Sequence, residues 1–282
     1  MKFADLHLHT FFSDGTFTPE ELVLRAQKAG LACIALTDHD SVEGCERAAA
    51  ACTNVQMDFI AGAELTAEHE DTEVHILGYF LDTKNPVLLK RIAEFQSVRH
   101  NRITEMVAAL NKLGIPLKAE AVFALANCKS PGRPHVARAL VKEKLIDNLD
   151  EAFERYLKKG RPAWVPKTKM SALESVELIH QAGGLAVMAH PGLNRTDDII
   201  PALVKAGLDG IECFHTKHST VMAERYLEIA EKYNLLVTGG SDCHGFSKKQ
   251  PLIGTVRLPY DHVEKLKAKV AERKSETTDK HR

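Results

Sequence analysis

The sequence has 282 residues, a net charge of −1, and 44% hydrophobic and 27% charged residues, proportions that are typical of a globular enzyme. A charge so close to zero argues against a protein drawn to nucleic acid or membrane by its overall field. No apolar run approaches the roughly 20 residues that span a bilayer, and the start, MKFADLHLHT, lacks the apolar core of a signal peptide. None of the six cysteines forms a CxxC pair. We therefore expect a reduced, cytoplasmic protein without a membrane partner.

Short apolar runs mark the expected strands, which cover Lys2–His9, Ala32–Thr37, Asp58–Glu64, Val74–Phe80, Leu185–His190, Gly210–Phe214 and Leu235–Gly239. Amphipathic segments separate several of these runs. The first segment begins with Thr18 as a cap and Pro19 at the first helical position, and Gly30 ends it. Ser171–Gly183 and Asp197–Gly207 repeat the pattern.

Repeated strand–helix units predict parallel strands joined by right-handed crossovers. Metal-binding side chains follow many different strands, which favours a barrel over an open sheet because the active sites of such barrels lie at the carboxyl ends of the strands. With seven strands, the expected fold is an α/β protein, a distorted (β/α)7 TIM-like barrel.

The strand–helix alternation stops between residues 85 and 169, where helical patterns cover Val87–Leu113, Ala119–Ala126, Pro134–Lys144 and Leu149–Lys158. We expect residues 85–169 to form a helical insertion domain in a discontinuous barrel made of 1–84 and 170–270, with a polar tail at 274–282. From 129 to 169 the chain carries eleven Lys or Arg and five Asp or Glu, a local charge of +6. Most of these charges are expected to be solvated.

Nine residues with metal-binding side chains lie at or near the ends of the apolar runs: His7, His9, Asp14, His39, Glu64, His75, His190, Asp242 and His244. His7 and His9 are two residues apart on one strand, so both rings face the same side. Imidazole nitrogens and carboxylate oxygens bind Zn, Mn and Fe, and bound cations make hydroxide available at neutral pH. The pattern predicts a hydrolase with more than one metal ion.

Most of these residues have a plainer interpretation when taken singly. Asp14 could be an ordinary turn residue, His39 could belong to a helix cap, and His75 could be a core histidine bonded to backbone. Glu64 can bridge two cations, since each carboxylate oxygen can take one. The shared position at strand ends favours a metal site over independent coincidences.

The motifs DLHLHT with SDG, TDHD, Glu64, His75, AHPG and SDCH, in this order, resemble those of the PHP family, named for polymerase and histidinol phosphatase. The resemblance extends from His7 to His244. It implies a distorted (β/α)7 barrel that holds two or three divalent metal ions, with Mn expected and Fe or Zn as alternatives. The helical segment after the fourth strand is similar to that of a bacterial subgroup. Members of that subgroup hydrolyse the 3′-phosphate of nucleoside 3′,5′-bisphosphates, and some trim RNA from its 5′ end.

Residue by residue, the resemblance assigns three sets of metal ligands. The first set is His7, His9, Glu64 and Asp242. The second set shares Glu64 and adds His75 and His190. The third set is Asp14, His39 and His244. Many relatives have histidine at the position of Asp14, so an aspartate here adds negative charge to the third site.

The resulting hypothesis is that a hydroxide bridging two metal ions attacks phosphorus in line with the leaving ribose oxygen. Glu64 and Asp242 would hold metal and orient the water as catalytic residues. His215 also falls at a strand end. It could donate a proton to the leaving oxygen, hydrogen-bond a phosphate, or act only through a neighbouring residue.

The loop before the helix at Pro134 is a candidate phosphate-binding site. Arg133 can hold a phosphate through two hydrogen bonds, and the free N–H groups of the helix start attract anions. In the resembling subgroup an Arg and a His in this loop, and a Lys near the return to the barrel, contact substrate phosphates. This implies roles for Arg133, His135 and Lys167, with a plain surface loop as the alternative.

The leading function is hydrolysis of the 3′-phosphate of nucleoside 3′,5′-bisphosphates, and only the resemblance favours the 3′ over the 5′ ester. A 5′-3′ exoribonuclease acting on short RNA could use the same site, and a histidinol-phosphate-type monoesterase is a weaker alternative. An amidohydrolase commonly needs a carboxylated lysine at a strand end, which this sequence does not offer. A non-catalytic metal-binding domain would be marked by lost ligands. The expected partner is a small phosphorylated nucleotide or a short oligonucleotide, and no stable protein partner is implied.

Overall fold

A computed structural model describes residues 1–70, 72–166, 170–194, 197–247 and 250–279. Its strands are β1 (Phe3–Leu8), β2 (Cys33–Leu36), β3 (Asp58–His69), β4 (Thr72–Tyr79), β5 (Met170–Ser171), β6 (Leu185–Met188), β7 (Gly210–His215), β8 (Leu236–Gly240) and β9 (Leu258–Pro259). Across these ranges the strands pair in the order β8-β7-β6-β4-β3-β2-β1-β9, with β5 beside β3. The strands β5 and β9 have two residues each, so the sheet that matters runs from β1 to β8.

The sheet closes between β1 and the segment that follows β8. The backbone N–H of Asp242 donates to the carbonyl oxygen of His7 at 2.9 Å, and the N–H of His9 donates to that of Cys243 at 3.1 Å. The path from β1 to β8 holds seven strands in the described part of the chain. The expected α/β fold, a distorted seven-stranded TIM-like barrel, is therefore confirmed.

Among the seven strands from β1 to β8, one runs against its neighbours, and the prediction of a wholly parallel barrel was wrong for it. The two-residue strand β9 also pairs antiparallel, with β1. β4 pairs antiparallel with both β3 and β6. The physical reason is the short connection: too few residues separate β3 from β4 to make the crossover that a parallel pair requires. Because β4 is reversed, its first residues, and not its last, lie at the rim where the parallel strands end.

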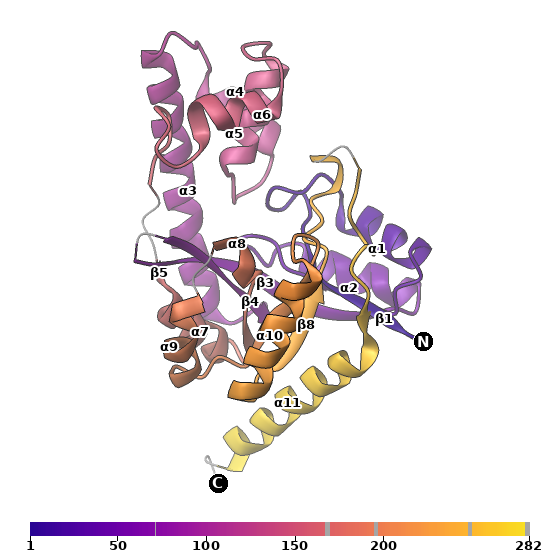
Figure 1. Cartoon of the computed structure of the whole chain (residues 1–282). Helices are drawn as coiled ribbons and strands as arrows, with labels where there is room; N and C mark the ends of the chain where they lie inside the picture. The colour runs from indigo at the N-terminus through magenta and orange to yellow at the C-terminus, as the bar shows by residue number, and fades with distance from the viewer. Residues whose placement is uncertain (71, 167–169, 195–196, 248–249, 280–282) are drawn as a thin grey trace.

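The barrel is surrounded by α1 (Pro19–Lys28), α2 (Cys45–Asn54), α7 (Ala172–Gln181), α8 (Pro191–Asn194), α9 (Ile200–Lys205), α10 (Thr220–Tyr233) and α11 (Tyr260–Asp279). α1 begins as the sequence predicted, because Thr18 and Glu21 bond reciprocally as a capping box. α11 lies at the end of the barrel opposite the insertion (Figure 1). It continues to Asp279, into the segment that we expected to be a polar tail.

The segment between β4 and β5 is helical. It contains α3 (Pro86–Lys112), α4 (Ala119–Ala126), α5 (Arg133–Lys142), α6 (Leu149–Ala152) and a π-helical turn at Phe153–Leu157. α3 rises from the barrel, and α4, α5 and α6 pack beside its far end (Figure 1). These helices share a hydrophobic cluster of their own, which includes Ile103, Leu110, Val136 and Leu140. The start of α5 is thereby held near the barrel rim.

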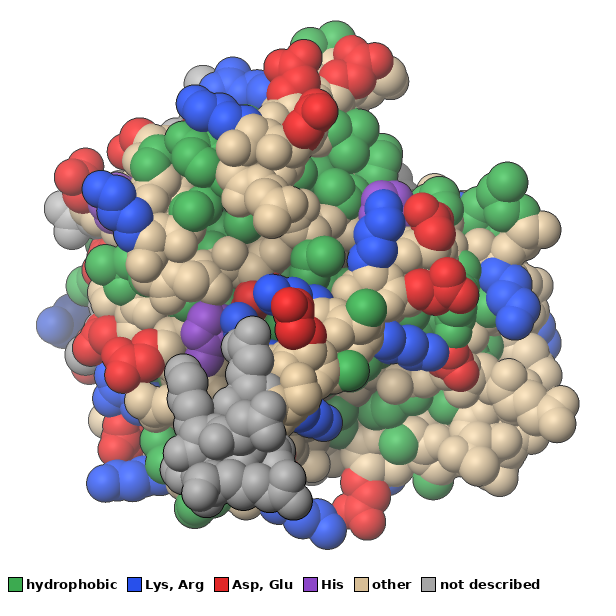
Figure 2. Space-filling view, turned by 90° about the horizontal axis from the view of Figure 1, so that it is seen from below, with side chains coloured by type: hydrophobic (Ala, Val, Ile, Leu, Met, Phe, Trp, Pro, Cys, Tyr) green, Lys and Arg blue, Asp and Glu red, His purple; other side chains and the backbone are tan. Residues whose placement is uncertain are grey.

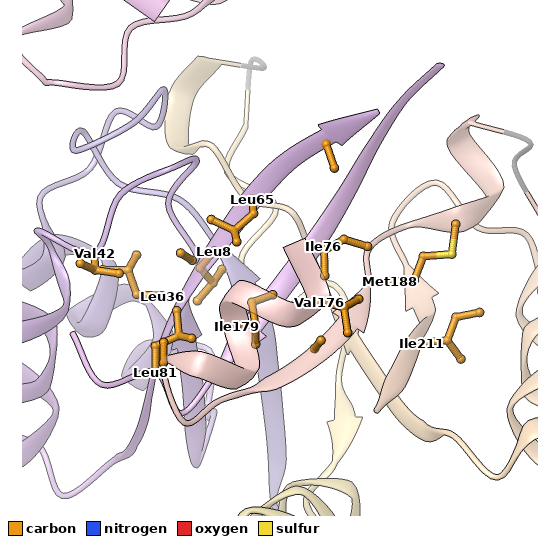
Figure 3. Close-up of a cluster of buried hydrophobic side chains, with 14 of the residues drawn as sticks. Leu8, Leu36, Val42, Leu65, Ile76, Leu81, Val176, Ile179, Met188 and Ile211 are labelled. Atoms are coloured by element: carbon orange, nitrogen blue, oxygen red, sulfur yellow. The ribbon is translucent and has the colours of Figure 1, made fainter. Parts of the chain in front are cut away.

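The main barrel core lies between the strands and the surrounding helices. Leu65 of β3 and Ile76 of β4 are directly paired across the hairpin, and Ile179 of α7 packs near them (Figure 3). Leu8 and Leu36 continue the same cluster on β1 and β2. Every second residue of these strands points the other way. Some of these alternate positions, such as Ala35 and Leu77, form a second apolar cluster, and others, such as Glu64 and His75, are polar.

The described surface carries charged side chains of both signs (Figure 2), as the near-zero net charge leads us to expect. Basic and acidic side chains are interspersed over the face seen from below (Figure 2). Within the described ranges, every helix is too short or too polar to cross a bilayer. All six cysteines are free, and five of them are buried.

The assigned core predicts that truncating two different leucines changes the free energy of unfolding by different amounts. Leu36 is fully buried in β2, whereas Leu24 on α1 is 50% exposed. Leu36→Ala should lower the free energy of unfolding by about 2–5 kcal/mol, because it removes buried contacts and leaves a cavity. Leu24→Ala should change it by less than about 0.5 kcal/mol. Urea unfolding followed by circular dichroism measures both, and equal losses would contradict the assigned core.

Candidate metal centre

The centre of the site is the carboxylate of Glu64, which lies in β3 and is fully buried. Its Oε1 is 2.6 Å from Nδ1 of His75 and 3.0 Å from Nε2 of His190. His75 lies near the start of the reversed strand β4, and His190 follows the end of β6. The antiparallel hairpin therefore brings a fourth-strand histidine to the same rim as the others.

The second oxygen of Glu64 faces three further imidazoles. Oε2 lies 3.0 Å from Nδ1 of His39 and 3.3 Å from Nε2 of both His7 and His9. His7 belongs to β1 and His9 follows it, with both rings fully buried. The Glu64 carboxylate thus lies close to five imidazoles, two of them at Oε1 and three at Oε2.

Asp242 completes one group of these side chains. Its Oδ1 lies 3.2 Å from Nε2 of His9 and 3.7 Å from Nε2 of His7. The backbone of Asp242 has φ +53°, a left-handed conformation that costs energy for a non-glycine residue. Gly240 permits the close approach of this segment to β1, since a Cβ there would lie 2.3 Å from Cβ of His7.

Asp14 and His244 form the outer part of the site. Oδ1 of Asp14 lies 3.1 Å from Nε2 of His244 and 4.0 Å from Nε2 of His39. One potential ligand atom from each of these three residues and from His9 lies within 4.8 Å of the others. The structure therefore brings all nine predicted ligand residues into one continuous cluster, although His39 approaches Glu64 as well as Asp14.

Many atoms of this cluster have no hydrogen-bond partner among the described residues. They are buried and include Nε2 of His7, both ring nitrogens of His9, Oδ1 of Asp14, Nδ1 of His39, Oε2 of Glu64 and Nδ1 of His190. Buried polar atoms are nearly always hydrogen-bonded in folded proteins. Nitrogen and oxygen donors left open at such short separations fit divalent cations.

The protein also keeps the carboxylates of the cluster ionised. Burial alone raises the pKa of Glu64, but His39, His75 and His7 outweigh it and hold that pKa well below its ordinary value. Burial is likewise outweighed at Asp14, where His244 and His39 lower the pKa of the carboxyl group. Ionised carboxylates are the form that binds metal. The same carboxylates outweigh burial and raise the pKa values of His75 and His244 to about 9, so these rings must release protons when a cation binds.

Glu212 supports two of the histidines, and the sequence reasoning gave it no role. Its Oε1 is 3.1 Å from Nδ1 of His7, and its Oε2 accepts a 2.8 Å hydrogen bond from the backbone N–H of His190. A carboxylate bonded to Nδ1 fixes the ring orientation and leaves Nε2 open toward the cluster. The signal that could have revealed it is a single acidic residue between the apolar Ile211 and Cys213 of strand β7.

Asp38 performs a similar task for the loop that carries Asp14. It accepts hydrogen bonds from the backbone N–H and hydroxyl of Thr10, at 2.7 and 2.6 Å, and from the hydroxyl of Ser13 at 2.6 Å. Arg138 of α5 donates to the backbone oxygen of Asp14. The position of Asp14 is therefore set both by the barrel and by the helical insertion.

His215 lies against Asp242, and its side chain is fully buried. Its Nδ1 accepts a hydrogen bond from the backbone N–H of Lys217 at 3.2 Å, so its Nε2 carries the proton. That Nε2 lies 3.5 Å from Oδ2 of Asp242. This nitrogen of His215 faces the Asp242 carboxylate, and the ring also lies beside that of His190, with 5.4 Å between the ring centroids.

A pocket of about 160 Å³ opens beside the cluster, bordered by His39 and His75 on one side and by arginines on the other. Arg133 begins α5 and lies 3.4 Å from Glu73. Arg102 of α3 donates to the carbonyl oxygen of Val165 at 2.8 Å. Burial and the neighbouring charge of Arg133 lower the pKa of Arg102 to about 10. Glu73, which borders the same pocket, offsets part of this repulsion, and a bound anion would offset more of it.

Arg99 also borders this pocket, and the sequence reasoning missed both Arg99 and Arg102. Arg99 pairs with Asp40 at 2.6 Å and donates to the hydroxyl of Thr66 at 3.1 Å. It therefore ties α3 to the barrel at the edge of the pocket. The spacing of three residues on a helix was the available signal, since it places both arginines on one face.

The other two predicted phosphate ligands are placed differently. His135 is buried in α5, and its Nδ1 accepts a hydrogen bond from the backbone N–H of Gly132 at 3.0 Å. Burial lowers the pKa of His135 to about 4, although the negative charge of Asp14 opposes this shift. Its observed contact fixes the loop that presents Arg133. Lys167 lies outside the described residues.

Several known proteins are similar to this chain over most of its length. The chain is 36% identical over 251 residues to the 5′-3′ exoribonuclease of Haemophilus influenzae, covering 86% of this chain and 90% of that protein. It is 34% identical over 252 residues to the 3′,5′-nucleoside bisphosphate phosphatase of Chromobacterium violaceum, covering 86% and 88%.

A solved structure from Bifidobacterium adolescentis, described as a metal-dependent phosphoesterase, superposes with a TM-score of 0.87 at 34% identity and covers 94% of this chain and 95% of that one. The PHP domain family matches residues 5–163, a range that includes six of the nine clustered ligands. The chain therefore belongs to the PHP domain family, and it is a hydrolase of phosphoric esters.

Proposed function

We propose that this enzyme hydrolyses the 3′-phosphate of nucleoside 3′,5′-bisphosphates. The observation that carries the proposal is the arginine-lined pocket directly beside the ligand cluster. A substrate with two phosphates can place one among the metal ligands and the other between Arg102 and Arg133. A substrate with a single phosphate group would leave one of these two phosphate sites empty.

The nine clustered residues are proposed to hold two or three divalent cations, with Mn²⁺ the expected ion and Fe or Zn the alternatives. His7, His9, Glu64 and Asp242 form one set. Glu64, His75 and His190 form a second, and Asp14, His39 and His244 form a third. When bound, such cations supply a nucleophilic hydroxide at neutral pH and neutralise charge on the phosphoryl oxygens.

The chain's own residues then have distinct tasks. Glu212 keeps the proton of His7 on Nδ1, so that Nε2 faces the cluster. His215 lies next to Oδ2 of Asp242 and orients that carboxylate. Its complete burial favours this positioning role over direct proton donation to the leaving oxygen. Asp242 and Glu64 remain ionised and hold the reacting centre in place.

Arg133 and Arg102 are proposed to bind the phosphate that is not cleaved. Arg133 is partly exposed at the start of α5, with 28% of its side chain accessible, so an incoming anion can displace its long contact to Glu73. His135 stabilises the loop that presents Arg133. A guanidinium group can grip a phosphate through two parallel hydrogen bonds. Lys167 stays a proposed third contact.

A second candidate function is 5′-3′ exoribonuclease activity on short RNA. Similarity to the Haemophilus influenzae enzyme of that name supports it. The chemistry is compatible with the same site, because the cleaved ester again lies next to a 5′-phosphorylated nucleotide. Histidinol phosphate would leave the arginine pocket empty, so it is the weaker candidate.

The first test is a substrate panel with Mn²⁺. It compares adenosine 3′,5′-bisphosphate, 3′-AMP, 5′-AMP, histidinol phosphate and a short 5′-phosphorylated RNA. We expect kcat/KM for the bisphosphate to exceed that for 3′-AMP by about 10- to 150-fold, since charged hydrogen bonds contribute about 1.5–3 kcal/mol. The products should be 5′-AMP and phosphate. A higher kcat/KM on RNA would favour the exoribonuclease, and release of 3′-AMP would contradict the proposed ester.

The second test concerns Glu64. Glu64→Gln keeps the shape of the side chain but removes the charge shared by the ligand sets. Turnover should fall by more than about 100-fold, because even residues that only support metal ligands are worth about 10–100-fold. Elemental analysis should show less bound metal, while circular dichroism remains unchanged. Glu177→Gln, on the exposed face of α7, is the matched control and should retain both metal and turnover.

The third test concerns the second phosphate. Arg133→Ala should raise KM for adenosine 3′,5′-bisphosphate by about 10- to 150-fold, because a charged hydrogen-bonding partner is lost. KM for 3′-AMP should stay within about twofold. Lys129→Ala removes an exposed cation of the same loop that pairs with Glu43, and it should change neither value. Equal effects of Arg133→Ala on both substrates would exclude a dedicated phosphate site.

A further inference from the structure

A second pocket, of about 340 Å³, borders the metal cluster on another side. Asp14 and His244 form its inner end, and Pro134, Leu149 and Phe153 contribute apolar walls. We call it the aromatic pocket. Its volume lies in the range of small-molecule binding sites. Its composition differs from that of the arginine-lined pocket, because most of its exposed lining is apolar.

The two pockets share Asp14, Pro134 and Phe153. A ligand that fills both must therefore pass the metal cluster at Asp14 and touch the ring of Phe153. The outer ligands Asp14 and His244 are each partly accessible, with 10% and 14% of their side chains exposed, whereas His7 and Glu64 are completely covered. His39 and His75, beside the arginine-lined pocket, are each 14% exposed as well. The cluster thus opens toward both pockets.

Phe153 occupies an unusual place in the backbone. It is the first residue of a five-residue π-helical turn that follows the short helix α6. π-helical turns are rare, and they often occur at functional sites because they displace a side chain from its normal helical position. The turn ends at Leu157, which is fully buried in the insertion core, while Phe153 packs against the edge of that core and is only partly covered.

The surroundings define the chemistry of the occupant. It carries a phosphoester at one end, because the inner wall consists of metal-ligand residues. A second anion reaches the arginines through the shared boundary. The rest of the lining sets the apolar Pro134, Leu149 and Phe153 beside polar side chains, which suits a planar group with polar edges. The polar residues are Arg138, Asp150 and Ser247. A nucleotide has this combination of phosphates and a planar heterocycle.

We propose that the aromatic pocket is a nucleobase subsite in which Phe153 stacks against the base of the bound nucleotide. The inference deepens the proposed function and rests on it for the identity of the ligand as a nucleotide. Stacking on an aromatic side chain contributes to binding with little preference among bases, because every base has a π face. The subsite therefore favours nucleotides over sugar phosphates without selecting one base strongly.

Equilibrium binding tests the subsite independently of turnover. Isothermal calorimetry compares 5′-AMP with ribose 5-phosphate, which has the same phosphate but no base. The wild-type protein should bind 5′-AMP more tightly. Phe153→Leu, which keeps an apolar side chain on the insertion, should weaken 5′-AMP binding by about 5- to 150-fold, the range for loss of one stacked base. Binding of ribose 5-phosphate should be unchanged, and Phe153→Trp should retain the preference for 5′-AMP.

Phe123→Leu is the matched control, since Phe123 lies on α4 and stacks with His100. It should leave both affinities unchanged, and circular dichroism of all variants reports folding. The subsite is overturned if wild-type protein does not distinguish 5′-AMP from ribose 5-phosphate, or if Phe153→Leu weakens both ligands equally or neither. Failure of the proposed function has a different signature: 5′-AMP binds through Phe153, but no phosphate is released from nucleoside bisphosphates.

Discussion

The whole site depends on one constraint: the buried Glu64 carboxylate must be surrounded by positive charge or by donors. A lone carboxylate in the interior would be strongly unfavourable. Here imidazoles from β1, β2, β4 and β6 regions meet its two oxygens. These rings cannot all satisfy their own nitrogens within the protein, and several remain without a hydrogen-bond partner among the described residues. The fold therefore holds a set of donors whose arrangement is completed by cations.

The barrel achieves this convergence by an irregular topology. A uniformly parallel barrel would place the first residues of its fourth strand at the far end from the other ligands. The reversed β4 brings His75 to the common rim and also shortens the connection from Glu64. The chain then leaves from the opposite end of β4 into α3, whose length carries Arg99 and Arg102 back along the barrel to the site (Figure 1).

The helical insertion supplies the parts of the site that contact substrate in our proposals. Arg133 and Pro134 begin α5, and Phe153 begins the π-helical turn. All three border pockets that end at barrel residues. In these proposals reaction and recognition are divided: the barrel would hold the reacting phosphoester, and the insertion would hold the second phosphate and the base. Arg138 joins the two parts through the backbone of Asp14.

Local sequence patterns predicted many of these structural features. Alternation of apolar residues and the capping pattern at Thr18 predicted the barrel strands and the helices of the insertion, and the strand-end positions of His7, His9 and Asp242 indicated a shared rim. Periodicity and capping depend on neighbours in sequence, so sequence determines them. The partnership of Glu212 with His7 joins residues 205 apart, and the meeting of Arg102 with Arg133 or of Phe153 with Asp14 depends on how α3 and α5 pack on the barrel. Long-range packing alone decides which distant side chains become neighbours, and only the tertiary structure shows it.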